Sequence, residues 1–248
     1  MPYNPTVMQS PFLQAHGLLK YIGLLLSGVC HQFPQHSFFV AGKQLPLCAR
    51  CSGTYLGALL GFVTLWRKGR MRAGRLPPAK VLAVLAAFIA FWAIDGLNSY
   101  FNFLTGRAIL YPPSNLLRLT TGLGNGLALS FVVFPVFNLF LWRELDKQRA
   151  LNGLGELAVP MLQALGLLLL LQSQVKVLFY PLLLAELLSV LLMLTTVNSI
   201  IVVITMHREN YAGGRRQALL PLALGLVLTF VELGGIAALR YCLSLRFY

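Results

Sequence analysis

The chain alternates long apolar runs with short polar segments. Backbone groups in hydrocarbon must bond to one another, and a helix of about twenty residues crosses the bilayer. The runs lack the apolar–polar alternation of a membrane barrel. We therefore predict an all-α fold, a polytopic transmembrane helix bundle of about six spans. The six runs lie at 48–66, 81–100, 115–142, 156–174, 181–206 and 218–241.

Two further elements are predicted before the first span. Residues 12–29 carry apolar side chains at three- and four-residue spacing, which predicts an N-terminal helix lying in the outer membrane interface. The alternative is a seventh span, which would move the N-terminus to the inner side. Residues 38–47 predict a short outer hairpin with its turn at Gly42 and Lys43. The resulting organisation is an outer segment over 1–47 and two three-span units over 48–142 and 143–248.

Composition and charge agree with a membrane location. Of the residues, 57% are hydrophobic and 11% charged, whereas soluble domains have roughly a quarter charged. The net charge of +13 comes mainly from alternate loops, near 67–80, 143–149 and 208–216. Such loops are cytoplasmic by the positive-inside rule, and they attract anionic lipids. We expect a multi-pass protein of the plasma (cytoplasmic) membrane of a prokaryote with both termini outside, and no nucleic-acid partner, since no binding motif accompanies the charge.

The polar segment before the first span contains the candidate chemistry. Cys30 and His31 are followed by a Cys-x-x-Cys pair, Cys48 and Cys51, at the start of the first span. Unpaired amides at a helix start favour thiolate. Two such sulfurs can converge on one ion, and Cys30 with His31 or His36 would complete a tetrahedral zinc site at the extracytoplasmic surface.

Other polar residues fall at the same depth once the topology is applied. Asp95 and Arg118 would form a buried ion pair between spans two and three, or line an outward-facing pocket beneath the cysteines. Ionisable groups at membrane depth usually pair or face a cavity. Acids on the outer side alone count against a transport path for protons or cations. The predicted polar layer comprises His36, Arg50, Asp95, Asn98, Arg118, Glu186, Glu232 and Cys242.

The motifs resemble a known family. Cys-His-Gln at 30–32 is followed by Leu-Pro-Leu-Cys-Ala-Arg-Cys-Ser-Gly at 45–53, Asp-Gly-x-Asn-Ser at 95–99 and Asn-x-x-Arg-x-x-Thr-Gly at 115–122. In this order they resemble the predicted membrane proteins grouped as domain of unknown function 2085, over about residues 25–130. The family commonly has arginine where this chain has His36. The resemblance implies a compact three-span unit and supplies no activity.

Three functions remain open. The first is a site for a thiophilic metal such as zinc, structural or metal-handling. The second is a thiol-disulfide oxidoreductase coupled to a quinone, using Cys48 and Cys51, a second pair of Cys30 and Cys242, and nearby Arg50. The third is a scaffold or subunit of a membrane complex without chemistry of its own. We rank metal binding first, and no reaction is predicted.

Overall fold

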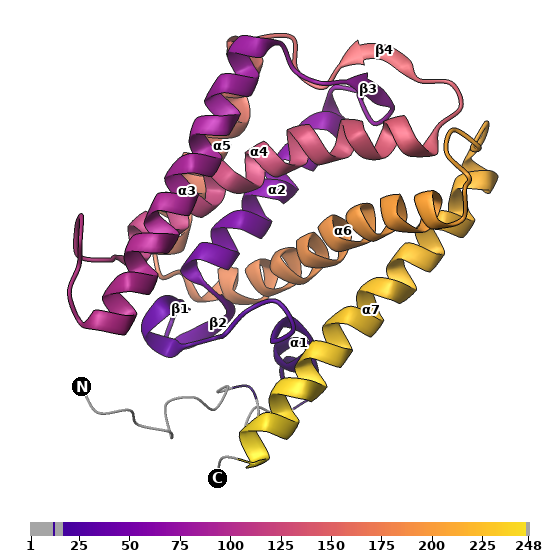
Figure 1. Cartoon of the computed structure of the whole chain (residues 1–248). Coiled ribbons are helices and arrows are strands. Elements are labelled where there is room, and N and C mark those ends of the chain that lie inside the picture. Colours follow the sequence, from indigo (N-terminus) through magenta and orange to yellow (C-terminus); the bar gives the residue numbers. More distant parts are fainter. Residues whose placement is uncertain (1–11, 13–16, 247–248) are drawn as a thin grey trace.

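The computed structural model describes residue 12 and residues 17–246. This part of the chain is predominantly helical, and the helices form a bundle (Figure 1). One antiparallel and one parallel pair of short strands lie at the ends of the bundle. The elements are α1 Leu18–Leu26, η3 Pro34–His36, β1 Ser37–Val40, β2 Lys43–Cys48, α2 Ala49–Arg67, β3 Ala73–Arg75, α3 Ala79–Thr105, α4 Asn115–Leu141, β4 Asp146–Arg149, α5 Leu154–Gln172, η4 Lys176–Leu178, α6 Phe179–Thr205 and α7 Arg215–Arg246.

The helices of the bundle match the predicted spans. Five helices, α3 to α7, are long and apolar enough to cross a membrane. The sixth, α2, has 19 residues, which gives a length of roughly 28 Å, but it is not among those five because Arg50, Ser52 and Thr54 dilute its apolar character. It packs mainly along α4. The prediction of an all-α, polytopic fold is confirmed. Neighbouring helices, more than lipid, surround α2.

Small residues let α2 and α4 approach until their backbones touch. A Cβ added at Gly53 or Gly57 would overlap backbone atoms of α4, and one at Gly122 or Gly126 would overlap backbone atoms of α2. Glycines at four-residue spacing permit such close contact between membrane helices. The pair α2 and α4 forms the centre of the bundle, with α3, α5 and α6 packed around it.

The outer end carries α1 and the predicted hairpin. Strands β1 and β2 pair antiparallel, and the turn falls at Ala41 and Gly42, which have positive φ of 51° and 78°. The predicted turn was therefore one residue late, because Lys43 already pairs with Val40. Residues 13–16 of the predicted interfacial helix lie outside the described part. The nine residues of α1 pack on α7 and β2, and this length is too short for a seventh span.

The opposite end is also folded, which the sequence did not predict. Strands β3 and β4 pair in parallel and join the loop after α2 to the loop after α4. Asn138 Nδ2 donates to the Ala73 carbonyl at 3.0 Å, and the Arg72 guanidinium lies 4.1 Å from the centre of the Trp142 ring. These contacts order the basic loops against one another.

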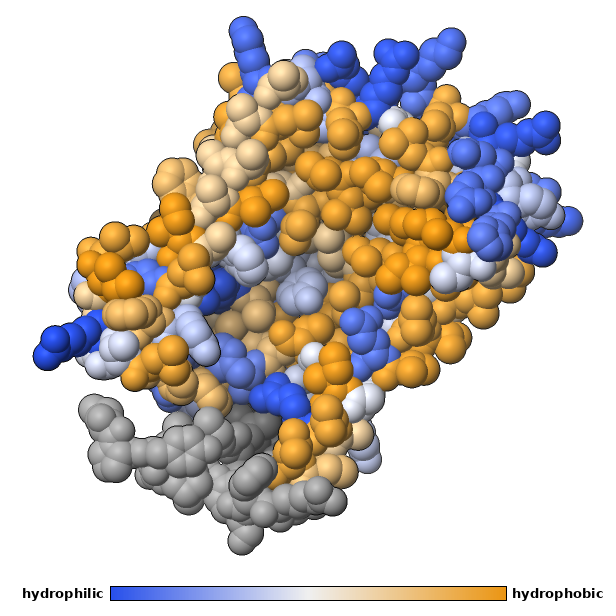
Figure 2. Space-filling model, in the orientation of Figure 1, coloured by the Kyte–Doolittle hydropathy of each residue, from blue (hydrophilic) through white to orange (hydrophobic). Residues whose placement is uncertain are grey.

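The surface agrees with a protein embedded in lipid. Hydrophobic residues cover the helices between the two ends, and hydrophilic residues gather at the end that carries β3 and β4 (Figure 2). Large apolar side chains are exposed on several helices, among them Leu162 (68%), Leu188 (58%) and Val231 (63%). An apolar belt of this kind is the surface that a bilayer covers.

Candidate metal centre

Three cysteine sulfurs meet at the outer end of the bundle. The Sγ atoms of Cys30, Cys48 and Cys51 all lie within 4.8 Å of one another. Cys30 and Cys48 are 4% exposed and Cys51 is partly exposed, so the group is largely enclosed. Zinc–sulfur bonds of about 2.3 Å at tetrahedral angles place sulfurs roughly 3.8 Å apart, so a small contraction would bring the three onto one ion.

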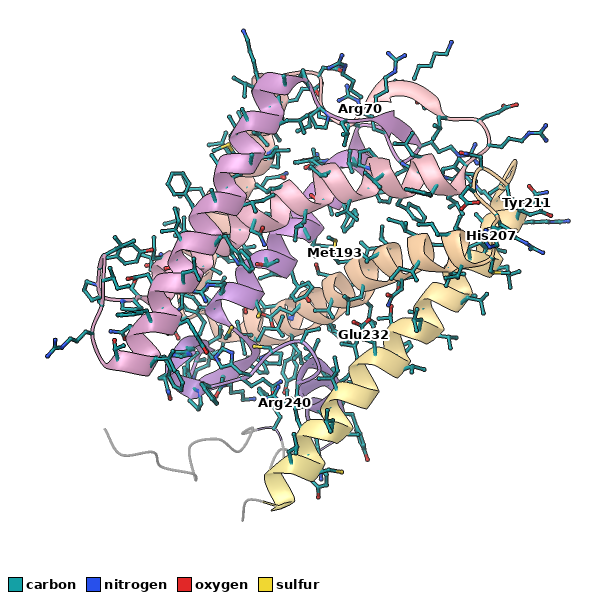
Figure 3. All side chains as sticks on the ribbon, viewed as in Figure 1. Arg70, Met193, His207, Tyr211, Glu232 and Arg240 are labelled. Carbon is teal, nitrogen blue, oxygen red and sulfur yellow. The ribbon has the colours of Figure 1, made fainter. Side chains whose placement is uncertain are left out.

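The segment after α1 places Cys30. Gln32 has a positive φ of 58°, and its Nε2 donates to the Gly23 carbonyl at 2.7 Å, which folds the chain back on α1. Arg240 reaches from α7 and donates to the carbonyls of Ser27 and Cys30 (Figure 3). Cys30 is therefore held by its own motif and by a helix more than 200 residues away in sequence.

The junction between β2 and α2 places the other two cysteines. Cys48 is the last residue of β2 and the N-cap of α2, and Cys51 follows one helical turn later on the same face. The Cys48 amide donates to Cys30 Sγ at 3.0 Å, and the Gln32 amide lies 3.5 Å from the same sulfur. Amide donors stabilise negative charge on sulfur. The neighbouring Cys48 side chain is the main cause that raises the pKa of the Cys30 thiol to about 12, so a metal would have to displace protons from this group.

The histidines do not join the sulfur group. His31 Nε2 lies 3.0 Å from His36 Nδ1, and the three-residue group that could hold a metal contains neither histidine. In this geometry the expected ligand His31 does not lie with the three sulfurs, and its place in the ligand set stays a prediction. Its ring is directed to His36, since adjacent residues such as Cys30 and His31 point apart. Burial lowers the pKa of both histidines, that of His36 to about 4.

Asp95 pairs with Arg50, not with Arg118. The Arg50 guanidinium donates to Asp95 Oδ2 from Nε at 3.2 Å and also from NH2. The same NH2 donates to Ser99 Oγ at 2.9 Å, and Tyr111 donates to Asp95 Oδ1 at 3.2 Å. The predicted ion pair between Asp95 and Arg118 is wrong, because the side chain of Arg50 reaches from the first turn of α2 to Asp95. The bond instead joins α2 to α3.

Asn98 and Arg118 have separate roles. Asn98 holds the loop after α3, since its Nδ2 donates to the Tyr111 carbonyl at 2.8 Å and its Oδ1 accepts from the Leu110 amide at 3.1 Å. Arg118 is buried near the start of α4, where its NH1 donates to Asn115 Oδ1 at 2.9 Å. Asn115 in turn donates to the Gln35 carbonyl at 3.0 Å, which ties α4 to the segment that carries the histidines.

A cavity of about 300 Å³ lies beside Cys48. Of the predicted polar layer, His36, Arg50 and Arg118 line it together with Cys48 and His31. The sequence thus anticipated a pocket near the cysteines, but it included residues that lie elsewhere. Those outside the lining are Asp95, Asn98, Glu186, Glu232 and Cys242.

The remaining members of the predicted layer are dispersed. Glu186 is fully buried behind the cysteine segment, where Ser52 donates to its Oε1. Glu232 lies on α7 (Figure 3), where it accepts from Asn198 Nδ2 of α6 at 3.1 Å, and it is not part of the cysteine group. Cys242 is exposed on α7 and lies outside the group that Cys30 forms with Cys48 and Cys51, so its pairing with Cys30 stays a prediction.

Helices of spanning length and an enclosed group of three thiols define a multi-pass membrane protein with a cysteine cluster that could hold a metal ion. The sequence comparisons agree with that class. The chain belongs to the family of predicted membrane proteins DUF2085, whose sequence model matches residues 30–132. The match runs from Cys30 into α4, so α5, α6 and α7 lie outside it. The resemblance in the sequence motifs is therefore confirmed.

The relatives are archaeal and uncharacterized. An uncharacterized protein of Methanocaldococcus jannaschii is 30% identical over 129 residues, which cover 50% of this chain and 76% of the relative. An uncharacterized protein of Methanothermobacter thermautotrophicus is 29% identical over 113 residues, or 46% of this chain and 91% of the relative. No solved structure matches the chain.

Proposed function

We propose that the chain binds a thiophilic metal ion such as Zn²⁺ through Cys30, Cys48 and Cys51, at the extracytoplasmic side of the membrane. The observation that carries this proposal is the convergence of three enclosed sulfurs within 4.8 Å, with an amide donor at 3.0 Å from one of them. Thiolate ligands suit zinc and Cu(I), whereas Mg²⁺ and Ca²⁺ prefer oxygen.

The ligand set favours metal handling over a purely structural clamp. Structural zinc sites use four protein ligands, and sites that act through the metal keep one position for an exchangeable ligand. Among the described residues, three sulfurs form the group. Cys48 also lines the cavity of about 300 Å³, so a small molecule could approach the site from that side.

The extracytoplasmic side is part of the proposal. The junction of β2 and α2, which carries Cys48 and Cys51, lies at the end of the bundle opposite β3 and β4 (Figure 1). The loops at that opposite end contain Arg67, Lys68, Arg70, Arg72 and Arg75, among other basic residues. This distribution supports a cytoplasmic location for the basic end, in contact with anionic lipids.

Elemental analysis with thiol counting tests the metal site. We expect about one metal ion per chain in protein purified without added chelator, with Cys30, Cys48 and Cys51 protected from alkylation until the metal is removed. A Cys48→Ser/Cys51→Ser variant should lose the metal. Cys242→Ser is the matched control and should retain it, because Cys242 is exposed and lies outside the group.

Thiol oxidation is the second candidate, favoured by the position of Cys48. This residue caps α2 and lines the cavity, as a reactive thiol at a helix N-terminus would. Oxidation of Cys48 and Cys51 to a disulfide would pass two electrons and two protons to a quinone, which becomes a quinol. A metal-free protein with a disulfide between these two residues that is re-formed by quinone would support this function and exclude the metal site. A protein that behaves normally without any of the cysteines would instead be a scaffold.

A further inference from the structure

The cavity beside Cys48 opens at the outer end of α3. Two of its lining residues, Tyr100 and Phe103, are 63% and 57% exposed, so they stand at the mouth. The volume of about 300 Å³ is at the lower end of sites that bind small molecules. A molecule entering from the outer membrane surface would reach Cys48 at its inner wall.

Arg118 gives the cavity a positive charge. Its side chain is 8% exposed, and its hydrogen-bond acceptor is the neutral amide of Asn115. Within the described part of the chain, no carboxylate lies within 4.0 Å of its guanidinium, and Asp95 is held by Arg50 and Tyr111. A buried cation without a counter-charge is costly. An anion bound in the cavity would supply this counter-charge.

Arg50 also lines the cavity, but its charge is paired with Asp95, and the rest of the lining is apolar or neutral. Phe33, Tyr100 and Phe103 supply aromatic surface, and Gly96 exposes the α3 backbone. The 3.0 Å contact between the rings of His31 and His36 requires one unprotonated nitrogen as acceptor. Aromatic walls suit the carbon skeleton of a ligand and disfavour a strongly hydrated inorganic anion.

We propose that this cavity binds a small organic carboxylate. The carboxylate group is bound by Arg118, whose planar guanidinium matches it, and the apolar part lies against Phe33 and Phe103. The ligand then sits beside Cys48. This inference rests on the proposed function only in naming the kind of molecule that reaches the metal site; the binding itself depends on Arg118 and on the shape of the cavity.

Fluorine NMR of 4-fluorobenzoate with the purified full-length chain in lipid nanodiscs tests the proposal. We expect saturable line broadening with the wild type, and a dissociation constant at least tenfold higher for Arg118→Gln. Arg118→Lys keeps the charge and should retain part of the affinity. Arg107→Gln is the matched control, because Arg107 is an exposed arginine outside the cavity, and it should bind as the wild type does.

A second variant tests the cavity without changing charge. A Cβ at Gly96 meets no atom within 4 Å, so Gly96→Leu should fold and fill the space, and binding should be lost. Gly166→Leu on α5 is the control, since its Cβ position is equally open and lies outside the cavity. Retained binding in Gly96→Leu would place the carboxylate elsewhere and overturn the proposal.

Further outcomes separate this inference from the metal site. Equal binding of 4-fluorobenzamide and 4-fluorobenzoate would mean that the cavity takes a neutral ring, such as a quinone head group, and would refute a carboxylate site. If the protein retains its metal but shows no saturable binding of 4-fluorobenzoate, the proposed cavity ligand is refuted and the proposed metal site is not. If metal-free Cys48→Ser/Cys51→Ser protein still binds 4-fluorobenzoate, the result supports the cavity ligand. The metal site is then judged by the metal content alone.

Discussion

Replacement of Asp95 by asparagine removes a buried charge while keeping the shape of the side chain. The Asp95 side chain is fully buried, and its partner Arg50 is 21% exposed. Removing one member of a buried pair costs about 3–5 kcal/mol because the other charge is left uncompensated. Since Arg50 retains some access to solvent, we expect Asp95→Asn to lower the free energy of unfolding by about 3 kcal/mol.

Denaturant unfolding of the purified chain in detergent micelles measures this loss. Glu209→Gln is the comparison, because Glu209 is exposed in the loop between α6 and α7, and surface substitutions of this kind usually change stability by about 0.5 kcal/mol or less. The double variant Arg50→Gln/Asp95→Asn should be less destabilised than the sum of its single variants, because no unpaired charge remains. If Asp95→Asn costs no more than Glu209→Gln, the Arg50–Asp95 pair does not hold α2 to α3.

Three further predictions concern the α2–α4 contact, the cysteine segment and the orientation in the membrane. Gly126→Val should destabilise the chain by more than about 2 kcal/mol, since even its Cβ overlaps the α2 backbone, whereas Gly166→Val, in open space, should change the midpoint of thermal unfolding little. Gln32→Ala should weaken metal affinity about tenfold in chelator competition, as loss of a group supporting a ligand does, and the exposed Gln35→Ala should not. An impermeant maleimide added outside intact cells should label the exposed Cys242; labelling only after lysis would reverse the proposed orientation.

The sequence predicted the features that depend on local pattern. An apolar run reveals a spanning helix wherever it occurs, and the observed α3 to α7 start and end within a few residues of the predicted runs. The predicted hairpin is present, with its turn at Ala41 and Gly42. The spacing of Cys48 and Cys51 alone places two sulfurs on one helix face. These inferences need no knowledge of how the helices pack.

Other features depend on how each helix is rotated about its axis, which depth alone does not determine. Asp95 and Arg118 lie at similar depth, but α2 presents Arg50 to Asp95 first. Arg240 and Gln32 hold the cysteine segment. In the sequence only their polarity stands out, within an apolar run for Arg240 and within the Cys-His-Gln motif for Gln32. The strands β3 and β4 are short and polar, and β4 reads Asp-Lys-Gln-Arg. Tertiary contacts, not strand propensity, form them.

The backbone contact between α2 and α4 has a consequence for biogenesis. As α2 leaves the ribosome, its polar first turns and exposed glycine surface have no partner, because α4 begins only at Asn115. The less apolar helix would therefore insert poorly by itself and gain a stable position once α4 covers it. Truncation of the chain between α3 and α4 should leave α2 prone to leave the membrane, while α3 stays inserted.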